Sequence, residues 1–324
     1  MTRTLVPTAD APPREPDRAR AARTADPGLG QSAALLLATR PRQWVKNLLV
    51  FAAPTAAGAI TQPVVAARSA VAFLVFVAAS SATYLVNDVV DRRSDQLHPV
   101  KMHRPVAAGL LSPQLALSAA VALASAAVMV AAIVSGRALA AVIAAYLVIS
   151  VAYSLVLKRT PIIELACVAA GFTLRAVAGG AATHVALSPW FLMVASFGSL
   201  FVVAGKRSVE QSVMEDRARS HRATLAAYPT AFLRSLRMLA MAVTVTTYCL
   251  WAFERAGGLG LGDRAEDIVW FELSIVPFVL AVLLVELAIE RGRAGEPEEL
   301  ALKDRGLQVL GLAWVALLLC GIFA

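Results

Sequence analysis

The sequence is poor in charged residues and in cysteine. Only 16% of its 324 residues are charged, whereas 58% are hydrophobic, and its mean hydropathy is +0.68. A water-exposed surface needs more charge than this, so an ordinary soluble protein is excluded. The three cysteines, Cys167, Cys249 and Cys320, lie in apolar runs without paired spacing or a histidine cluster. They indicate neither a disulfide framework nor a zinc site, and we expect them to be packing residues.

Long apolar runs are abundant instead. About 20 mostly apolar residues are enough to cross the bilayer core of about 30 Å, and such runs recur along the chain. The sequence therefore predicts an all-α membrane protein with nine transmembrane helices, whose boundaries are loose by several residues. The nine predicted spans cover residues 44–60, 64–86, 113–135, 138–157, 161–182, 188–205, 232–253, 268–290 and 306–323.

The N-terminal residues 1–30 differ from the rest of the chain. They are rich in Pro, Arg, Asp and Ala and show no apolar period, so we expect a disordered cytoplasmic tail. They also lack the apolar core of a secretory signal. Residues 31–324 are expected to form one transmembrane domain.

The distribution of basic residues predicts the orientation. With a cytoplasmic N-terminus, 25 of the 30 Lys and Arg residues fall on inner segments and four on outer loops. Basic loops resist translocation, so the C-terminus should lie outside the cell membrane. The long inner segments 87–112 and 206–231 place the chemistry at the cytoplasmic face. Because the basic residues are scattered over several loops, no nucleic-acid partner is predicted.

An acidic cluster stands where the second predicted span ends, in the sequence NDVVDRRSD from Asn87 to Asp95. On a continuous helix, Asp88, Asp91 and Asp95 would lie on one face, within about 10 Å along its axis. Such carboxylates repel one another unless a cation joins them, and Mg²⁺ prefers carboxylate and phosphate oxygens. The alternative is a solvated acidic helix end. The cations that follow, Lys101 and Arg104, favour a diphosphate site.

Two further basic segments allow two interpretations each. The segment RPRQWVKN, which ends with Lys46 and Asn47, is either an interfacial anchor or part of the site. The segment from Tyr153 to Lys158, at the inner end of the fourth predicted span, is similarly ambiguous.

Arg175 is an intramembrane cation. It lies about 20 Å along the fifth predicted span, where a charge that faced lipid would be costly. Glu164, three turns earlier, projects from the same face of this helix. Arg175 is therefore expected to face a central polar cavity that opens to the cytoplasm, although a structural pairing with another buried group is the alternative.

A third cytoplasmic cluster, GKRSVE, contains Lys206, Arg207 and Glu210. Charged loops usually contact solvent or lipid headgroups. Because these three residues stand at the boundary of the sixth predicted span, they could instead point toward the aspartates.

These motifs together resemble the UbiA superfamily of intramembrane prenyltransferases. The resemblance covers the chain from about residue 38 to its end, and the motifs that carry it are RPxxWxKN at 40–47, NDxxDxxxD at 87–95, Arg104-Pro105 with Gly109, and YxxxxK at 153–158. It implies nine helices around a cavity that opens to lipid, with Mg²⁺ on the aspartates holding a diphosphate.

One departure from the superfamily pattern bears on the substrate. Typical members carry a second aspartate-rich motif where this chain has GKRSVE at 205–210. This variant resembles the branch that transfers phosphoribose from phosphoribosyl diphosphate to decaprenyl phosphate, in actinobacterial arabinan synthesis. A cation pair could hold the second phosphate of that donor without another metal.

The resemblance implies a role for each candidate residue. Asp88 and Asp91 would bind Mg²⁺, with Asp95 as a further ligand or a supporting residue. Lys46, Asn47, Lys101 and Arg104 would hold the diphosphate, and Lys206 and Arg207 the 5-phosphate. The polyprenyl phosphate oxygen would attack C1 of the ribose with inversion and without a general base. The remaining predicted substrate-binding residues are Asn87, Tyr153, Lys158, Arg175 and Glu210.

Two alternatives remain at this point. One is a UbiA-type enzyme that transfers a prenyl group from its diphosphate to an aromatic acceptor, which the missing second aspartate motif disfavours. The other is a transporter, because Arg175 and Glu164 could line a path through the membrane. The sequence leaves a homo-oligomer open.

Overall fold

A computed structural model describes residues 30–215, 227–256, 268–292 and 297–323. The predicted tail, residues 1–30, lies outside the described residues except for Gly30. The described chain is helical and contains no strand, which confirms the all-α prediction. The helices are α2 (Gln31–Ala38), η1 (Pro41–Phe51), α3 (Ala52–Ala56), η2 (Ala59–Thr61), α4 (Pro63–Val90), α5 (Arg92–Leu97), η3 (Lys101–His103), α6 (Pro113–Leu155), η4 (Leu157–Arg159), α7 (Ile163–Thr183), α8 (Pro189–Glu215), α10 (Thr230–Arg255), α11 (Ile268–Glu290), α12 (Pro297–Lys303) and α13 (Arg305–Phe323).

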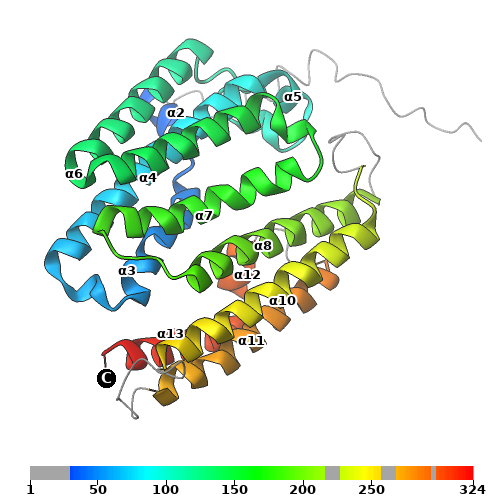
Figure 1. Ribbon diagram of the computed structural model, residues 1–324. Helices are drawn as coiled ribbons and strands as arrows, with labels where there is room; N and C mark the ends of the chain where they lie inside the picture. Colours follow the sequence, from blue (N-terminus) through cyan, green and yellow to red (C-terminus); the bar gives the residue numbers. More distant parts are fainter. Residues whose placement is uncertain (1–29, 216–226, 257–267, 293–296, 324) are drawn as a thin grey trace, which may run out of the picture.

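Seven of the described helices are long and apolar enough to cross a membrane, so this is a multi-pass membrane protein. Six of them, α4, α7, α8, α10, α11 and α13, each match one predicted span. The seventh, α6, covers both spans predicted at 113–135 and 138–157. Its backbone leaves the helical region at Gly136 (φ 77°, ψ −168°), and Figure 1 shows the chain turning back there. The count of nine crossings stays a prediction.

The predicted first span, 44–60, differs from expectation because it is not one continuous α-helix. Residues 41–51 form the 3₁₀ helix η1, and the five-residue helix α3 follows it. Pro54 has no N–H to donate to the carbonyl of Val50, four residues earlier, so one α-helical hydrogen bond is missing where η1 meets α3.

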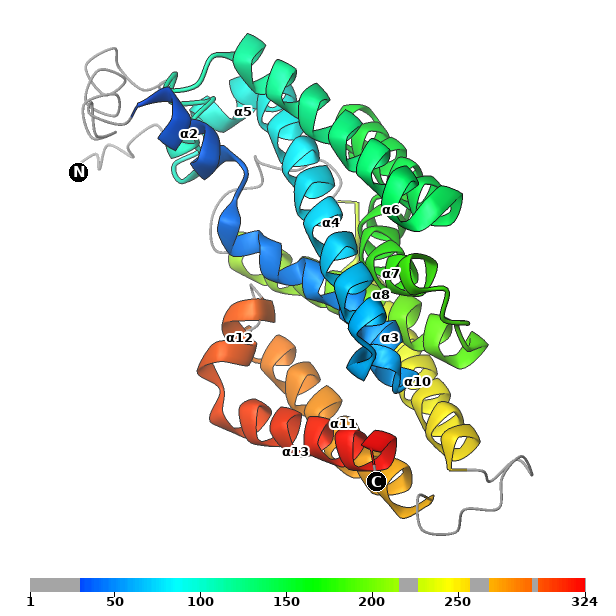
Figure 2. The same ribbon diagram turned by 90° about the vertical axis from the view of Figure 1, so that its left-hand side faces the viewer.

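The long helices form a bundle in chain order. Each long helix packs mainly against its neighbours in the sequence, and η1 packs against both α4 and α7. Figures 1 and 2 show α4, α6 and α7 at one side of the bundle, α8 and α10 in the middle, and α11 with α13 at the other side.

Small residues line the contact between η1, α4, α6 and α7. This core combines Phe76 and Tyr146 with alanines from three helices, and alanine lets backbones approach closely in a membrane. Large apolar side chains such as Leu74, Ile133 and Leu312 are exposed instead, as expected for surfaces that face lipid. The η1 segment packs against α4 and α7 with one face. Asn47 and Val50 are buried on that face and Lys46 is partly buried, whereas Val45 and Leu48 are exposed.

Candidate active site

The three aspartates of the acidic cluster lie at the junction of α4 and α5. The helix is nearly continuous there, because Asp91 alone (φ −90°, ψ 2°) separates the two elements. Asp88 and Asp95 are 2% and 3% exposed. They are therefore not the residues of a solvated helix end, which was the alternative interpretation of this sequence.

Asp88 and Asp95 face one common positive group. Nη1 of Arg104 donates to Oδ1 of Asp88 at 3.3 Å and to Oδ2 of Asp95 at 2.7 Å. Arg40 also pairs with Asp88, and its guanidinium lies 4.9 Å from the centre of the Tyr84 ring. Arg40 has φ +57°, a conformation that a residue with a side chain adopts only when its surroundings hold it there.

Asp91 takes a different partner. Its carboxylate pairs with the ammonium of Lys158, which stands on η4 between α6 and α7. The structure thus brings Lys158, predicted from the YxxxxK motif, to the acidic cluster across 67 residues of sequence. The turn that follows Lys158 is strained at Ile162 (φ +68°), whose N–H donates to Oη of Tyr228 at 2.6 Å. Burial raises the pKa of the Tyr228 hydroxyl, so this oxygen stays protonated and neutral near pH 7.

The arrangement of these carboxylates can be tested against a magnesium ion. Within the described parts of the chain, no three His, Cys, Asp or Glu side chains form a group that could hold a metal by themselves. However, Mg²⁺ usually takes only one or two carboxylates, keeps waters and completes its shell with substrate phosphate. Asp88 and Asp95, which converge on one cation, fit such an ion in kind, whereas Asp91 is turned to Lys158.

A cavity of about 260 Å³ lies beside the acidic cluster. Its lining includes three cations, Arg40, Lys46 and Arg175, and contains no carboxylate. Six hydroxyl groups and the amide of Asn87 supply further polar contacts. The full lining is Arg40, Lys46, Thr83, Tyr84, Asn87, Tyr146, Ser150, Tyr153, Ser154, Cys167, Val168, Gly171, Phe172 and Arg175. The charge and hydroxyl content suit a polyanionic ligand that carries hydroxyls.

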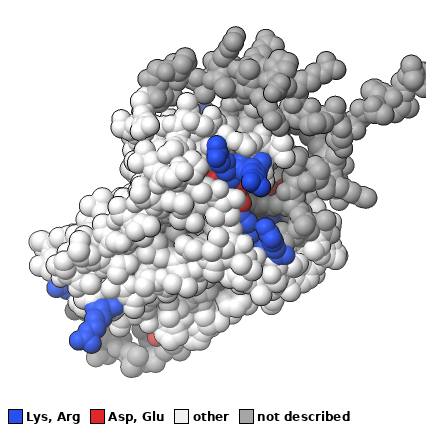
Figure 3. All heavy atoms as spheres, turned by 90° about the horizontal axis from the view of Figure 1, so that it is seen from above, with Lys and Arg blue, Asp and Glu red and all other residues white. Residues whose placement is uncertain are grey.

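Figure 3 shows a face of the molecule that is mostly uncharged. Near its centre, basic side chains gather around a few acidic atoms in a hollow. This concentration of charge on an otherwise neutral surface is what an anion-binding opening requires.

Several predicted residues meet at this cavity. Lys46, Asn87, Tyr153 and Arg175 line it directly. Asn47, which is completely buried, contacts Arg175 through its side-chain oxygen. Lys101 lies on η3, three residues before Arg104, and Lys206 lies on α8; neither is among the lining residues.

Arg207 occupies an environment other than the one that the sequence suggested. Its Nε and Nη2 donate to the two oxygens of Glu164, both at 2.8 Å, and its Nη1 donates to Glu210 at 2.7 Å. Arg207 is 6% exposed and does not line the cavity. Its guanidinium therefore joins α8 to α7, and Glu164, which lies on the same helix as Arg175, pairs with Arg207. The predicted phosphate-binding roles of Arg207 and Glu210 do not follow from this geometry.

The Arg207–Glu164 pair leads to a stability prediction. Arg207→Met should destabilise the protein by about 3 kcal/mol or more, because it leaves the buried Glu164 carboxylate without its partner. The double variant Arg207→Met with Glu164→Leu should recover much of this loss, because it removes both charges. The free energy of unfolding in mixed detergent micelles, measured for each variant, tests both expectations. Equal losses in the single and double variants would contradict the pairing.

Polar residues spaced four apart along a helix are a sequence signal for this cavity that the motifs alone do not include. Tyr146, Ser150 and Ser154 stand on one face of the apolar helix α6, and all three line the cavity. Thr83 and Asn87 repeat this spacing on α4. A stripe of hydroxyls within a membrane span therefore marks the helix face that lines a polar cavity.

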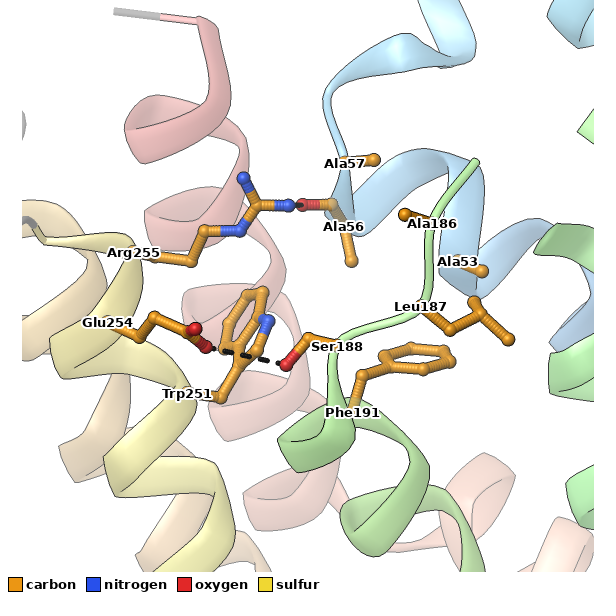
Figure 4. A pocket seen from close by; sticks show the side chains of 10 residues that line it. All are labelled: Ala53, Ala56, Ala57, Ala186, Leu187, Ser188, Phe191, Trp251, Glu254 and Arg255. Atoms are coloured by element: carbon orange, nitrogen blue, oxygen red, sulfur yellow. Dashed lines mark hydrogen bonds between the residues drawn. The ribbon is translucent and has the colours of Figure 1, made fainter. Parts of the chain in front are cut away.

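A second cavity, of about 270 Å³, is lined by residues of other segments. Figure 4 shows it between α3, the start of α8 and the end of α10. Arg255 donates to the backbone oxygen of Ala56 at 2.7 Å, and Ser188 donates to Glu254 at 3.4 Å. One acid and one base balance each other here, so this cavity lacks the excess of positive charge found beside the aspartates.

Known proteins share both sequence and fold with this chain. The model of the UbiA prenyltransferase family matches residues 48–296. The decaprenyl-phosphate phosphoribosyltransferase of Mycolicibacterium smegmatis is 43% identical over 298 residues, which cover 90% of this chain and 93% of that protein. The protein of the same name from Corynebacterium glutamicum is 41% identical over 293 residues, which cover 89% and 86%.

Solved structures agree on the fold. A UbiA homologue from Archaeoglobus fulgidus, bound to DMAPP and Mg²⁺, has a TM-score of 0.66 at 16% identity, over 89% of this chain and 97% of that one. The same homologue bound to GPP and Mg²⁺ has a TM-score of 0.65 at 18% identity, over 89% and 98%. At these identities the likeness establishes the arrangement of helices.

Proposed function

Because this chain belongs to the UbiA prenyltransferase family, and is therefore an enzyme, we propose that it transfers 5-phosphoribose from phosphoribosyl diphosphate to a polyprenyl phosphate. Diphosphate is the leaving group. Two relatives at 43% and 41% identity, named for this transfer to decaprenyl phosphate, support the proposal over nine-tenths of the chain. The product would be the lipid-linked phosphoribose used for cell-wall arabinan.

The observation that carries the proposal is the composition of the cavity. It has three cations, six hydroxyls and no carboxylate in its lining, directly beside the buried aspartates. A prenyl diphosphate would present an apolar chain, which needs neither the hydroxyls nor additional cations. A phosphorylated sugar with a diphosphate presents two separate anionic groups and ribose hydroxyls, which match this lining.

The acidic cluster would provide the metal site. We propose that Asp88 and Asp95 hold Mg²⁺, with Asp91 as the third carboxylate. A phosphate that paired with Lys158 would release Asp91 from its present partner. When bound, the ion would neutralise the charge that develops on the leaving diphosphate.

Basic residues would bind and orient the donor. Arg40 and Arg104, which contact Asp88 from two different segments, stand where the diphosphate would lie. Lys46, inside the cavity, would bind the same group from η1. The phosphate oxygen of the lipid attacks C1 of the ribose, the bond from C1 to the diphosphate oxygen breaks, and the electron pair leaves with diphosphate. The attacking oxygen is already an anion near pH 7, so no general base is needed.

The distribution of basic residues supports an orientation for this chemistry. We propose a cytoplasmic N-terminus, an outer C-terminus, nine crossings of the cell membrane and a cavity that opens to the cytoplasm and to lipid. Four of the residues around the site, Arg40, Lys46, Arg104 and Lys158, are on segments counted as inner. The break at Gly136 lets α6 cross twice.

Incubation of the purified protein with labelled phosphoribosyl diphosphate, polyprenyl phosphate and Mg²⁺ tests the proposal. Formation of a lipid-linked phosphoribose is expected. Turnover of a prenyl diphosphate with an aromatic acid, and no phosphoribosyl product, would indicate an aromatic prenyltransferase instead. Solute movement across vesicles without any covalent product would indicate a transporter. Chelation of divalent cations should stop the transfer and added Mg²⁺ should restore it.

A further inference from the structure

Arg175 is a buried cation without an acidic partner. It is 5% exposed and lies in the interior of α7, inside a membrane span. Within the described parts of the chain, no carboxylate forms an ion pair with it, and its hydrogen bonds all go to neutral acceptors. These are Oδ1 of Asn47 at 2.7 Å, the backbone oxygen of Gly171 at 2.6 Å and Oη of Tyr146 at 3.1 Å.

The surroundings hold the guanidinium in place without cancelling its charge. The rings of Phe76, Tyr146 and Phe172 lie 5.6, 4.9 and 5.6 Å from its central carbon. The amide nitrogen of Asn47 donates to Ser80 at 3.3 Å, which turns the oxygen of Asn47 toward Arg175. The Tyr146 ring is held edge-on against Phe76, with the ring centres 5.1 Å apart. Both hydrogen-bonding partners are thus themselves fixed.

Arg207 provides a comparison, because it is a buried arginine with a structural role in the same fold. Two oxygens of Glu164 and one of Glu210 surround that guanidinium, which does not reach the cavity. Arg175 has no such carboxylates, and it lines the cavity. A guanidinium has five N–H groups, and the three hydrogen bonds of Arg175 leave two of them for a ligand. A charge buried in a membrane span without a counter-charge costs free energy, and such residues mark functional sites.

We propose that Arg175, oriented by Asn47 and Tyr146, binds a phosphate monoester in this cavity. This inference rests on the proposed function, in which the aspartates and their basic neighbours take the diphosphate. The remaining monoester belongs either to the ribose 5-position of the donor or to the polyprenyl phosphate, and the planar fork of arginine suits both. Arg175 thereby takes the role that the sequence suggested for Arg207.

The choice of donor provides a direct test. Ribose 1-diphosphate lacks the 5-phosphate but keeps the reacting bond. The ratio of kcat/KM for phosphoribosyl diphosphate to kcat/KM for ribose 1-diphosphate is independent of the amount of folded enzyme. Arg175→Gln should lower this ratio about 10- to 100-fold, as expected for the loss of hydrogen bonds to a charged group. Arg175→Lys keeps the charge but not the fork and should lie between.

Two control variants accompany these measurements. Arg68→Gln makes the same change on α4 at a position that does not line the cavity, and it should leave the ratio unchanged. Lys206→Gln tests the other residue that the sequence suggested for the 5-phosphate. A second readout needs no turnover and no metal, because ribose 5-phosphate carries only the monoester. If Arg175 binds the 5-phosphate of the donor, wild-type protein should bind ribose 5-phosphate in calorimetry, and Arg175→Gln should weaken this binding.

The outcomes separate the two sources of phosphate. A lowered donor ratio assigns Arg175 to the 5-phosphate. An unchanged ratio with a 10- to 100-fold higher KM for the lipid assigns it to polyprenyl phosphate. If neither changes, or if only Lys206→Gln lowers the ratio, the inference is wrong. A wild-type protein that makes no lipid-linked phosphoribose would refute the proposed function before any variant is compared.

Discussion

Asp88→Asn is expected to lower turnover at least about 100-fold at saturating Mg²⁺, which is the usual scale for losing a charged group that orients a metal or stabilises a transition state. The amide keeps an oxygen for Arg40 and Arg104 but loses the negative charge that would hold the ion. Those two arginines are 26% and 25% exposed, so solvent can screen their charges. The fold should therefore survive. Turnover and the melting temperature, measured on the same preparation, separate the two effects.

The second cavity offers a matched control for this variant. Glu254→Gln makes the same change from acid to amide at a carboxylate that contacts Ser188, outside the proposed active site. Its turnover should equal that of the wild type. Near-normal turnover by Asp88→Asn in saturating Mg²⁺ would show that Asp88 does not bind the metal. A melting temperature that fell together with the rate would instead indicate a structural role.

The acidic cluster could be predicted from sequence because its chemistry is local. Asp88 and Asp95 are spaced so that a nearly continuous helix brings both to Arg104. Asp91, at the junction of α4 and α5, pairs with Lys158 instead. The apolar runs predicted six of the seven long helices for the same reason, since the length needed to cross a bilayer is a property of one segment. The gap between the two predicted spans that share α6 falls at Gly136, where the backbone leaves the helical region.

Contacts between helices could not be predicted in this way. The sequence suggests that Arg207 is a phosphate ligand, because the position of a charge at a span boundary does not indicate which residue it contacts. Only packing of α7 against α8 brings Glu164 to it, across 43 residues of sequence. Arg175 was recognised as a cation that must face a cavity or a partner, but Asn47 and Tyr146 became its contacts through the path of η1 and α6.

Gly179→Ala is expected to disrupt the site from a distance. A Cβ at Gly179 would lie 2.0 Å from the backbone oxygen of Val50, where ordinary contacts begin at 3.4 Å. That oxygen can lie so close because Gly179 presents only hydrogen to it. Backbone must move, so a loss of stability of about 1–3 kcal/mol or more is expected. A shift of about 1 Å in the η1 segment that carries Lys46 would lower kcat/KM by about 100-fold.

Two companion variants show whether backbone contact is the cause. Gly198→Ala places its Cβ at an ordinary 3.6 Å from Thr244, inside α8, and should leave activity intact while helix stability rises slightly. Val50→Ala, combined with Gly179→Ala, should fail to restore activity, because the clash is with the main chain and not with the valine side chain. Rescue by Val50→Ala would mean that side-chain packing, rather than the close approach of η1 to α7, controls the position of Lys46. If Val50→Ala does not restore activity, and Gly198→Ala has normal activity, the close contact between the backbones of η1 and α7 is what matters. The absence of a side chain at Gly179 then allows η1 to approach α7 closely enough for Lys46 to reach the cavity.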